Sequence, residues 1–210
     1  ETLEGLLKHN GPVEDLPLVE NLIGIKNFKK KINFDTYPSL EAQISAISDD
    51  IAYNNHDIQD GIKANLFKLE ELMEIEFFKS IYLKYKNKIN KKNYKIAIYQ
   101  IIRDSIDLMI RDLLKNTKKN LRNLKIKNSK DITQSDQLIV CFSDKIKNTE
   151  KEIKTFLRTK MYNNKSVLRK NQRGKVIIKK LFNNIKSKPL KYLSKDQLTK
   201  DKYRAISDFI

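Results

Sequence analysis

Apolar residues recur at spacings of three, four and seven along most of the chain, which is the period of amphipathic helices. The clearest apolar stripe predicts one long helix over about residues 39–66, beginning at the N-cap residue Ser39. The stripe consists of Leu40, Ile44, Ile47, Ile51, Ile58, Ile62 and Leu66. Similar patterns predict helices over about residues 69–84, 94–118, 143–161 and 167–182, and shorter ones at 2–8 and from about 200. The pattern predicts an all-α protein.

Turn-forming residues are scarce, which supports the same fold class. The chain has 210 residues with only 5 Gly and 4 Pro, too few for a many-stranded sandwich or barrel. No internal repeat or boundary is visible, so we expect a single helical domain over residues 1–210, built as a bundle of packed helices. Residues 13–37 carry mixed signals that fit a short helix with an irregular connector. Both ends of the sequence lie inside helical or apolar patterns, so we expect a segment of a longer protein.

The charge balance is strongly basic. Lys and Arg number 43 against 26 Asp and Glu, which gives a net charge of +17 and suggests a polyanionic partner such as nucleic acid or nucleotide phosphates. The alternative is codon bias, because a chain rich in Lys, Asn and Ile can carry lysine on every solvated face without any partner. The single cysteine, Cys141, lies in an apolar run and fits the core of a protein from a reducing, cytoplasmic compartment. No apolar stretch approaches the length of a membrane span.

Polar residues form a second stripe on the predicted helix at residues 39–66. At about 100° per residue, Asp49, Tyr53, His56 and Asp60 align along one face, with Asp57 beside them. Carboxylates and imidazoles suit a divalent cation, and hydroxyl and carboxylate groups suit the sugar of a nucleotide. An ordinary solvated helix face is the alternative. Four acids between residues 49 and 60 form a local negative pole in a basic chain, which a bound cation would relieve.

Two segments carry a family resemblance. Residues 38–43, Pro-Ser-Leu-Glu-Ala-Gln, and residues 49–61, Asp-Asp-Ile-Ala-Tyr-Asn-Asn-His-Asp-Ile-Gln-Asp-Gly, closely resemble the bacterial dGTPase-like branch of the HD-domain hydrolases. Residues 1–12, 154–162 and 203–210 resemble further stretches of the same enzymes in the same order, and residues 85–140 are compatible with them. The resemblance implies the C-terminal part of an HD-domain-type helical bundle.

The resemblance also implies roles for individual residues. The family's metal site has two His and two Asp, and Asp49 corresponds to its final Asp, with the adjacent Asp50 as the second choice. Tyr53 and Asp57 match positions that contact the nucleotide sugar.

Two further matches lie in a later helix. Lys154 matches a position near the triphosphate, and Tyr162 matches one near the sugar or base. A solvated helix lysine is the alternative for Lys154. The other three metal ligands are expected upstream of Glu1, since His9 and His56 do not match them. We keep His9, Asn10 and His56 as further possible site residues.

The activity implied by the resemblance is hydrolysis of deoxynucleoside triphosphates to deoxynucleoside and triphosphate, with a divalent metal ion such as Mg or Mn. With three of the four ligands missing, the segment alone is expected to be inactive. Family membership also implies ring-like homo-oligomers and single-stranded DNA as an occasional regulator. Two alternatives remain open. One is a non-catalytic basic helical protein that binds nucleic acid through its lysine runs at 84–95, 115–130 and 165–191. The other is a degenerate or split subunit that folds without activity.

Overall fold

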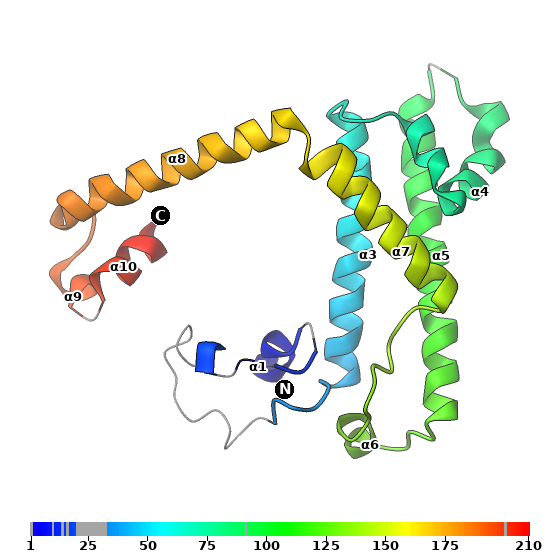
Figure 1. Ribbon diagram of the computed structural model, residues 1–210, viewed down its shortest axis with the longest axis horizontal. Coiled ribbons are helices and arrows are strands. Elements are labelled where there is room, and N and C mark those ends of the chain that lie inside the picture. The colour runs from blue at the N-terminus through cyan, green and yellow to red at the C-terminus, as the bar shows by residue number, and fades with distance from the viewer. Residues whose placement is uncertain are drawn as a thin grey trace. The chain divides into compact units, whose positions relative to one another are not determined.

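The regular secondary structure of the described residues is helical. The computed structural model describes residues 2–9, 11–13, 15, 17–19, 33–90, 92–199 and 201–210. Helices and turns make up all the regular structure of these residues, without a strand among them (Figure 1). The all-α prediction is therefore confirmed. Among the same residues, no helix combines the length and the apolar character needed to cross a membrane.

The chain divides into two compact units, Glu1–Leu157 and Arg158–Ile210. From the sequence we expected a single helical domain over residues 1–210, and this domain assignment stays a prediction. The described helices of the first unit are α1 (Thr2–Leu7), α3 (Leu40–Lys63), the 3-10 helices η2 (Leu69–Glu74) and η3 (Lys86–Lys88), α4 (Glu76–Tyr85), α5 (Tyr94–Asn123), α6 (Ser129–Thr133) and α7 (Asp144–Leu157).

The sequence predicted the bounds of helix α3 to within three residues. Ser39 caps its first turn, because its hydroxyl oxygen accepts a hydrogen bond from the Ala42 amide at 3.4 Å. Of the predicted apolar stripe, Ile51, Ile58 and Ile62 are buried. Ile44, from the same stripe, is 48% exposed.

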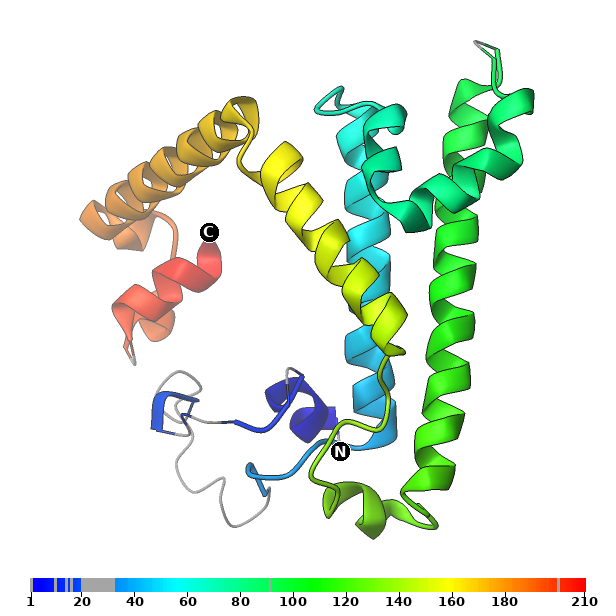
Figure 2. The same ribbon diagram turned by 45° about the vertical axis from the view of Figure 1, so that its right-hand side comes forward.

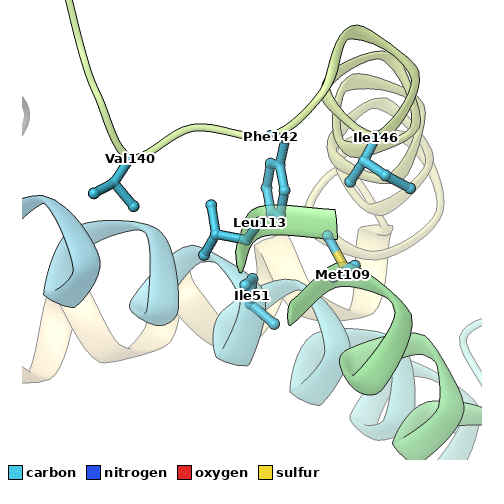
Figure 3. Packing of buried hydrophobic residues seen from close by; sticks show 6 residues of the cluster. All are labelled: Ile51, Met109, Leu113, Val140, Phe142 and Ile146. Carbon is cyan, nitrogen blue, oxygen red and sulfur yellow. The ribbon is translucent and has the colours of Figure 1, made fainter. Parts of the chain in front are cut away.

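A shared apolar core fixes α3 against α5 and α7. Figure 3 shows this cluster, in which side chains from the three elements and from the connector before α7 meet. Its buried members are Ile51, Met109, Leu113, Val140, Phe142 and Ile146. Helix α3 contacts both α5 and α7, and α7 runs diagonally across α3 in both ribbon views (Figure 2). Burial of these side chains, at about 1.5–3 kcal/mol each, orients the opposite face of α3 toward solvent.

Side-chain amides of α3 and α5 hold the connector of residues 138–143, which leads into α7. The buried Gln43 accepts hydrogen bonds from the amides of Ile139 and Val140, both at 3.0 Å, and donates to the Pro38 carbonyl at 2.9 Å. From α5, Asn116 donates to the carbonyls of Cys141 and Phe142 at 2.9 and 3.1 Å. The backbone of a segment without regular structure is thereby satisfied inside the unit.

The second unit contains a π-helical turn η4 (Arg158–Tyr162), α8 (Lys165–Ser187), the 3-10 turn η5 (Pro189–Lys191), α9 (Lys195–Leu198) and α10 (Lys202–Phe209). Its core is a small cluster of the buried Ile185, Leu193 and Ile206. Phe182 of α8 stacks on Tyr203 of α10 with ring centroids 6.3 Å apart. This cluster packs α10 against the C-terminal end of α8.

Candidate functional site

The predicted polar stripe lies on one uninterrupted helix. Helix α3 continues through Asp49, Tyr53 and Asp57, as predicted, with the buried Ile51 and Ile58 on its core face. The Asp49 side chain is 58% exposed and Tyr53 is 64% exposed. His56 and Asp60 are exposed as well, and Asp57 is half-buried. Within the first unit, the stripe can therefore meet a ligand from solvent.

Helix α1 brings a histidine to Asp49. Gly5 allows α1 to approach α3 closely, because a Cβ there would come within 3.2 Å of the Ala42 Cβ. Lys8 is fully buried and donates to Glu4 at 2.6 Å and to Thr36 at 3.0 Å, which fixes the end of α1. The next residue, His9, has its Nε2 3.8 Å from Asp49 Oδ2. Asn10, another candidate, lies outside the described residues.

Asp50 faces a different partner, on α7. Its Oδ2 lies 3.4 Å from Lys154 Nζ, and Lys154 also contacts Glu150 Oε1 at 2.7 Å. Partial burial by itself lowers the pKa of Lys154. The hydrogen bond to Glu150 and the charges of Glu150 and Asp50 outweigh that effect, so the pKa is raised above its ordinary value of 10.5. Lys154 is thus held as a cation beside the acidic stripe.

A pocket adjoins Asp50 on the N-terminal side of the stripe. It has a volume of about 200 Å³. Its polar lining comes from His9, Gln43 and Asp50, and its remaining walls come mainly from apolar residues of α3 and the connector of residues 138–143. Because Gln43 fixes that connector, the same amide also sets the shape of the pocket wall.

The residues described here do not form a metal site by themselves. No group of three or more His, Cys, Asp and Glu with metal-binding geometry occurs among the described residues. Asp49 and His9 supply two adjacent potential ligands, while the Asp50 carboxylate is engaged by Lys154. A catalytic ion needs about three protein ligands in fixed geometry. The divalent metal ion and the location of its further ligands stay predictions from the family resemblance.

The remaining candidate, Tyr162, belongs to the second unit. It ends the π-helical turn η4 and is 44% exposed. The roles proposed from the resemblance for Tyr53, Asp57, Lys154 and Tyr162 stay predictions. Sequence reasoning did not name Glu150 or Gln43. The spacing of four residues between Glu150 and Lys154 is the helical ion-pair spacing and could have pointed to Glu150. No local pattern could have identified Gln43, whose partners lie 96 and 97 residues away.

Comparison with known proteins identifies relatives of this chain. A phosphohydrolase-associated domain matches residues 140–210. A deoxyguanosinetriphosphate triphosphohydrolase-like protein of Pelagibacter ubique is 64% identical over all 210 residues, which make up 57% of that protein. The chain belongs to the deoxyguanosinetriphosphate triphosphohydrolase-like family. Like-named relatives from Bartonella tribocorum and Rickettsia typhi are 37% and 32% identical over 87% and 100% of the chain.

The chain spans about half the length of the curated relatives it matches, 57%, 47% and 56% in these three cases, and it matches their C-terminal part. The family resemblance seen in residues 38–43 and 49–61 is therefore confirmed, and membership points to a hydrolase family.

Proposed function

We propose that this chain supplies one side of the active site of an enzyme that hydrolyses deoxynucleoside triphosphates, dGTP or a close analogue, to deoxynucleoside and triphosphate. The observation that carries the proposal is the exposed face of α3. It presents Asp49 and Tyr53 to solvent next to His9, while Asp50, one position on, pairs with Lys154. An acidic pole flanked by a fixed cation suits a ligand that combines a hydroxylated sugar with a phosphate chain.

Each residue takes a role that its chemistry permits. Asp49 would provide one carboxylate ligand to a divalent ion such as Mg or Mn, and such an ion would supply the activation of water for attack on phosphorus. The remaining ligands would come from the part of the relatives that this chain does not match. Tyr53 and Asp57 hold the sugar hydroxyl through hydrogen bonds. Lys154, whose pKa is raised by Glu150, offsets charge on the triphosphate. A role for Tyr162 near the sugar or base stays a prediction from the family resemblance.

The test uses a chimera with the Pelagibacter ubique relative, in which this chain replaces the segment it matches at 64% identity. We expect the chimera to release tripolyphosphate from dGTP in the presence of Mg or Mn, and the 210-residue chain alone to release none. Asp49→Ala in the chimera should abolish release, because the loss of a ligand removes the ion. The matched control is Asp60→Ala on the same helix, whose side chain is 65% exposed and, among the described residues, pairs with Lys63.

The two substitutions separate the proposed site from a general effect of charge on α3. Tripolyphosphate release that persists in the Asp49→Ala chimera would remove Asp49 from the site and make Asp50 the next residue to replace. Equal loss in both variants would indicate damage to α3. Metal content, measured by mass spectrometry of the purified chimeras, should fall with Asp49→Ala and stay unchanged with Asp60→Ala.

A second candidate function is binding of single-stranded nucleic acid, and the distribution of charge favours it. Residues 158–210 contain 16 Lys and Arg against three Asp, so these 53 residues carry +13 of the net charge of +17. Within them, α8 has eight basic residues and no acidic residue. Codon bias acts on the whole chain and does not by itself explain this concentration. Homo-oligomer formation stays a prediction from the family resemblance.

A further inference from the structure

A basic groove lies on the C-terminal half of α5, on residues that the proposed active site does not use. Four cationic residues, Lys115, Lys118, Lys119 and Arg122, line a cavity of about 660 Å³ together with Asn116, Asn123, Asp112 and Ser143. The four cations occupy positions i, i+3, i+4 and i+7, so they share one face of the helix. At 1.5 Å per residue they span about 10 Å along the axis.

These four cations are not paired with a carboxylate of the described residues. All four are exposed, and within the described part of the chain none of them forms an ion pair or hydrogen bond through its side chain. Like charges at spacings of three and four residues destabilise a helix. Arg111 on the same helix shows the usual alternative, since it pairs with Asp107 at 2.8 Å. An anionic ligand in the groove would relieve the repulsion among the four.

The polar side chains at the floor of the groove already have hydrogen-bond partners within the protein. Asp112 accepts hydrogen bonds from the amide and hydroxyl of Ser143 at 2.8 and 2.7 Å. Asn116 is committed to the carbonyls of Cys141 and Phe142. The one carboxylate in the lining is therefore turned to the protein, and the binding capacity left to a ligand is that of the cations.

We propose that this groove binds the oligophosphate chain of a small molecule, three or so linked phosphates, at a site separate from the Asp49 stripe. The match is one of charge and length, because four cations within about 10 Å can neutralise closely linked phosphates at once. A free tripolyphosphate and the triphosphate of a nucleotide share this chemistry. An extended nucleic-acid strand would have its phosphates spread beyond the four residues.

The test is calorimetric titration of the full 210-residue chain with sodium tripolyphosphate, in EDTA, at low and at physiological salt. Replacing Lys115 and Lys119 by Gln should weaken binding at least about tenfold, because two charge-assisted contacts are lost. A second double variant, Lys118→Gln with Arg122→Gln, should do the same. Glutamine has nearly the helix propensity of lysine, and far-UV circular dichroism checks the fold.

The matched control removes the same charge from the other end of α5, by Lys95→Gln with Arg103→Gln, and should change binding by less than about twofold. Asp49→Ala should leave it unchanged, which separates this site from the proposed active site. Competition by dGTP would assign the groove to nucleotides, and its absence to free oligophosphate. No binding, equal weakening in groove and control variants, or binding of a 20-residue oligothymidylate in place of tripolyphosphate would overturn the proposal.

Discussion

At the scale of single residues, the candidate site contains a lysine whose pKa is shifted by the carboxylates that contact it. Lys154 has a raised pKa because of Glu150 and Asp50, despite the opposing effect of burial. A raised lysine pKa means that the stabilisation from these contacts is complete below pH 10.5, the ordinary value, and is lost as the pH rises through the higher folded value. The cation is therefore secure throughout the neutral range.

Glu150→Gln should lower the pKa of Lys154, because it removes a charge 2.7 Å from Nζ and leaves the desolvation in place. The measurement is an NMR titration that follows the Lys154 side chain in the 210-residue chain. Glu152→Gln is the matched control, since Glu152 is exposed on the same helix. An unchanged Lys154 pKa in Glu150→Gln, or an equal fall in the control, would show that Glu150 does not determine the protonation of Lys154.

The sequence predicted which candidate residues share a helix better than it predicted the neighbours of those residues. Asp49, Tyr53 and Asp57 lie on one helix because the apolar period of α3 fixes which face is buried. The approach of His9 to Asp49 could not be predicted, since it depends on the packing of α1 over Gly5 and on the buried Lys8. Contacts between elements depend on tertiary packing, which a local pattern does not encode.

At the scale of elements, replacing Gly174 and Gly61 by alanine should have opposite effects on stability. Gly→Ala in an exposed helix interior stabilises by up to about 1 kcal/mol. At Gly174 of α8 a Cβ would meet nothing, so Gly174→Ala should slow hydrogen exchange in α8 peptides. At Gly61 a Cβ would clash with the ring of the buried Phe67, which packs edge-on against Phe156 at 4.9 Å.

Gly61→Ala should therefore destabilise the first unit, because overpacking costs about 1–3 kcal/mol and exceeds the gain in propensity. Urea denaturation should show a lower midpoint, and hydrogen exchange in α3 peptides should accelerate. Stabilisation by Gly61→Ala would mean that the Phe67 ring can move aside without cost.

Gln43 should matter for the same unit through the connector that it holds. Gln43→Met fills a similar volume and removes the acceptor for two backbone amides at 3.0 Å each. Leaving buried donors unpaired costs about 1–3 kcal/mol each, so we expect a clear fall in the urea midpoint. Gln59→Met on the same helix is the control and should change stability by less than about 0.5 kcal/mol. Equal midpoints for the two variants would show that water replaces Gln43.

The helices themselves were predictable in kind and less so at their ends. The sequence predicted one helix over about 69–84, and the structure has η2 and α4 meeting at Ile75, which is extended. Burial continues through Leu72, Ile75 and Phe78, so the apolar pattern does not register the break. Helix α5 ends at Asn123, five residues beyond the predicted Lys118. Its last turns are held by the hydrogen bond from Asn120 to Ile139, which hydrophobic periodicity does not detect.

At the scale of the whole molecule, charge is distributed unevenly between the units. The first unit is close to balanced at +4, and the second carries +13. Self-repulsion of that size destabilises a small unit, and the second unit has only one small apolar cluster among its described residues to oppose it. The basic excess therefore has a cost to stability, which a polyanionic partner would offset.

We expect the 210-residue chain to bind a 20-residue oligothymidylate at low salt, with an affinity that falls linearly with salt on logarithmic axes, because each neutralised phosphate releases a counterion. Fluorescence anisotropy measures the affinity and its dependence on salt. Replacing Arg169, Arg173 and Lys180 of α8 by Gln should reduce the slope by about 2, at roughly 0.7 per phosphate contact. These three residues are spaced by four and seven positions and share one face of α8.

The matched control replaces three exposed lysines of the first unit, Lys68, Lys88 and Lys145, by Gln, which removes the same charge. If net charge alone drives binding, the two triple variants will lose affinity and slope equally, and the second unit will have no special part. If the second unit provides the surface, only the α8 variant will change. No binding even at low salt would leave codon bias as the explanation of the lysines, since a solvated lysine needs no partner. A concentration of charge in one unit predicts the second of these results.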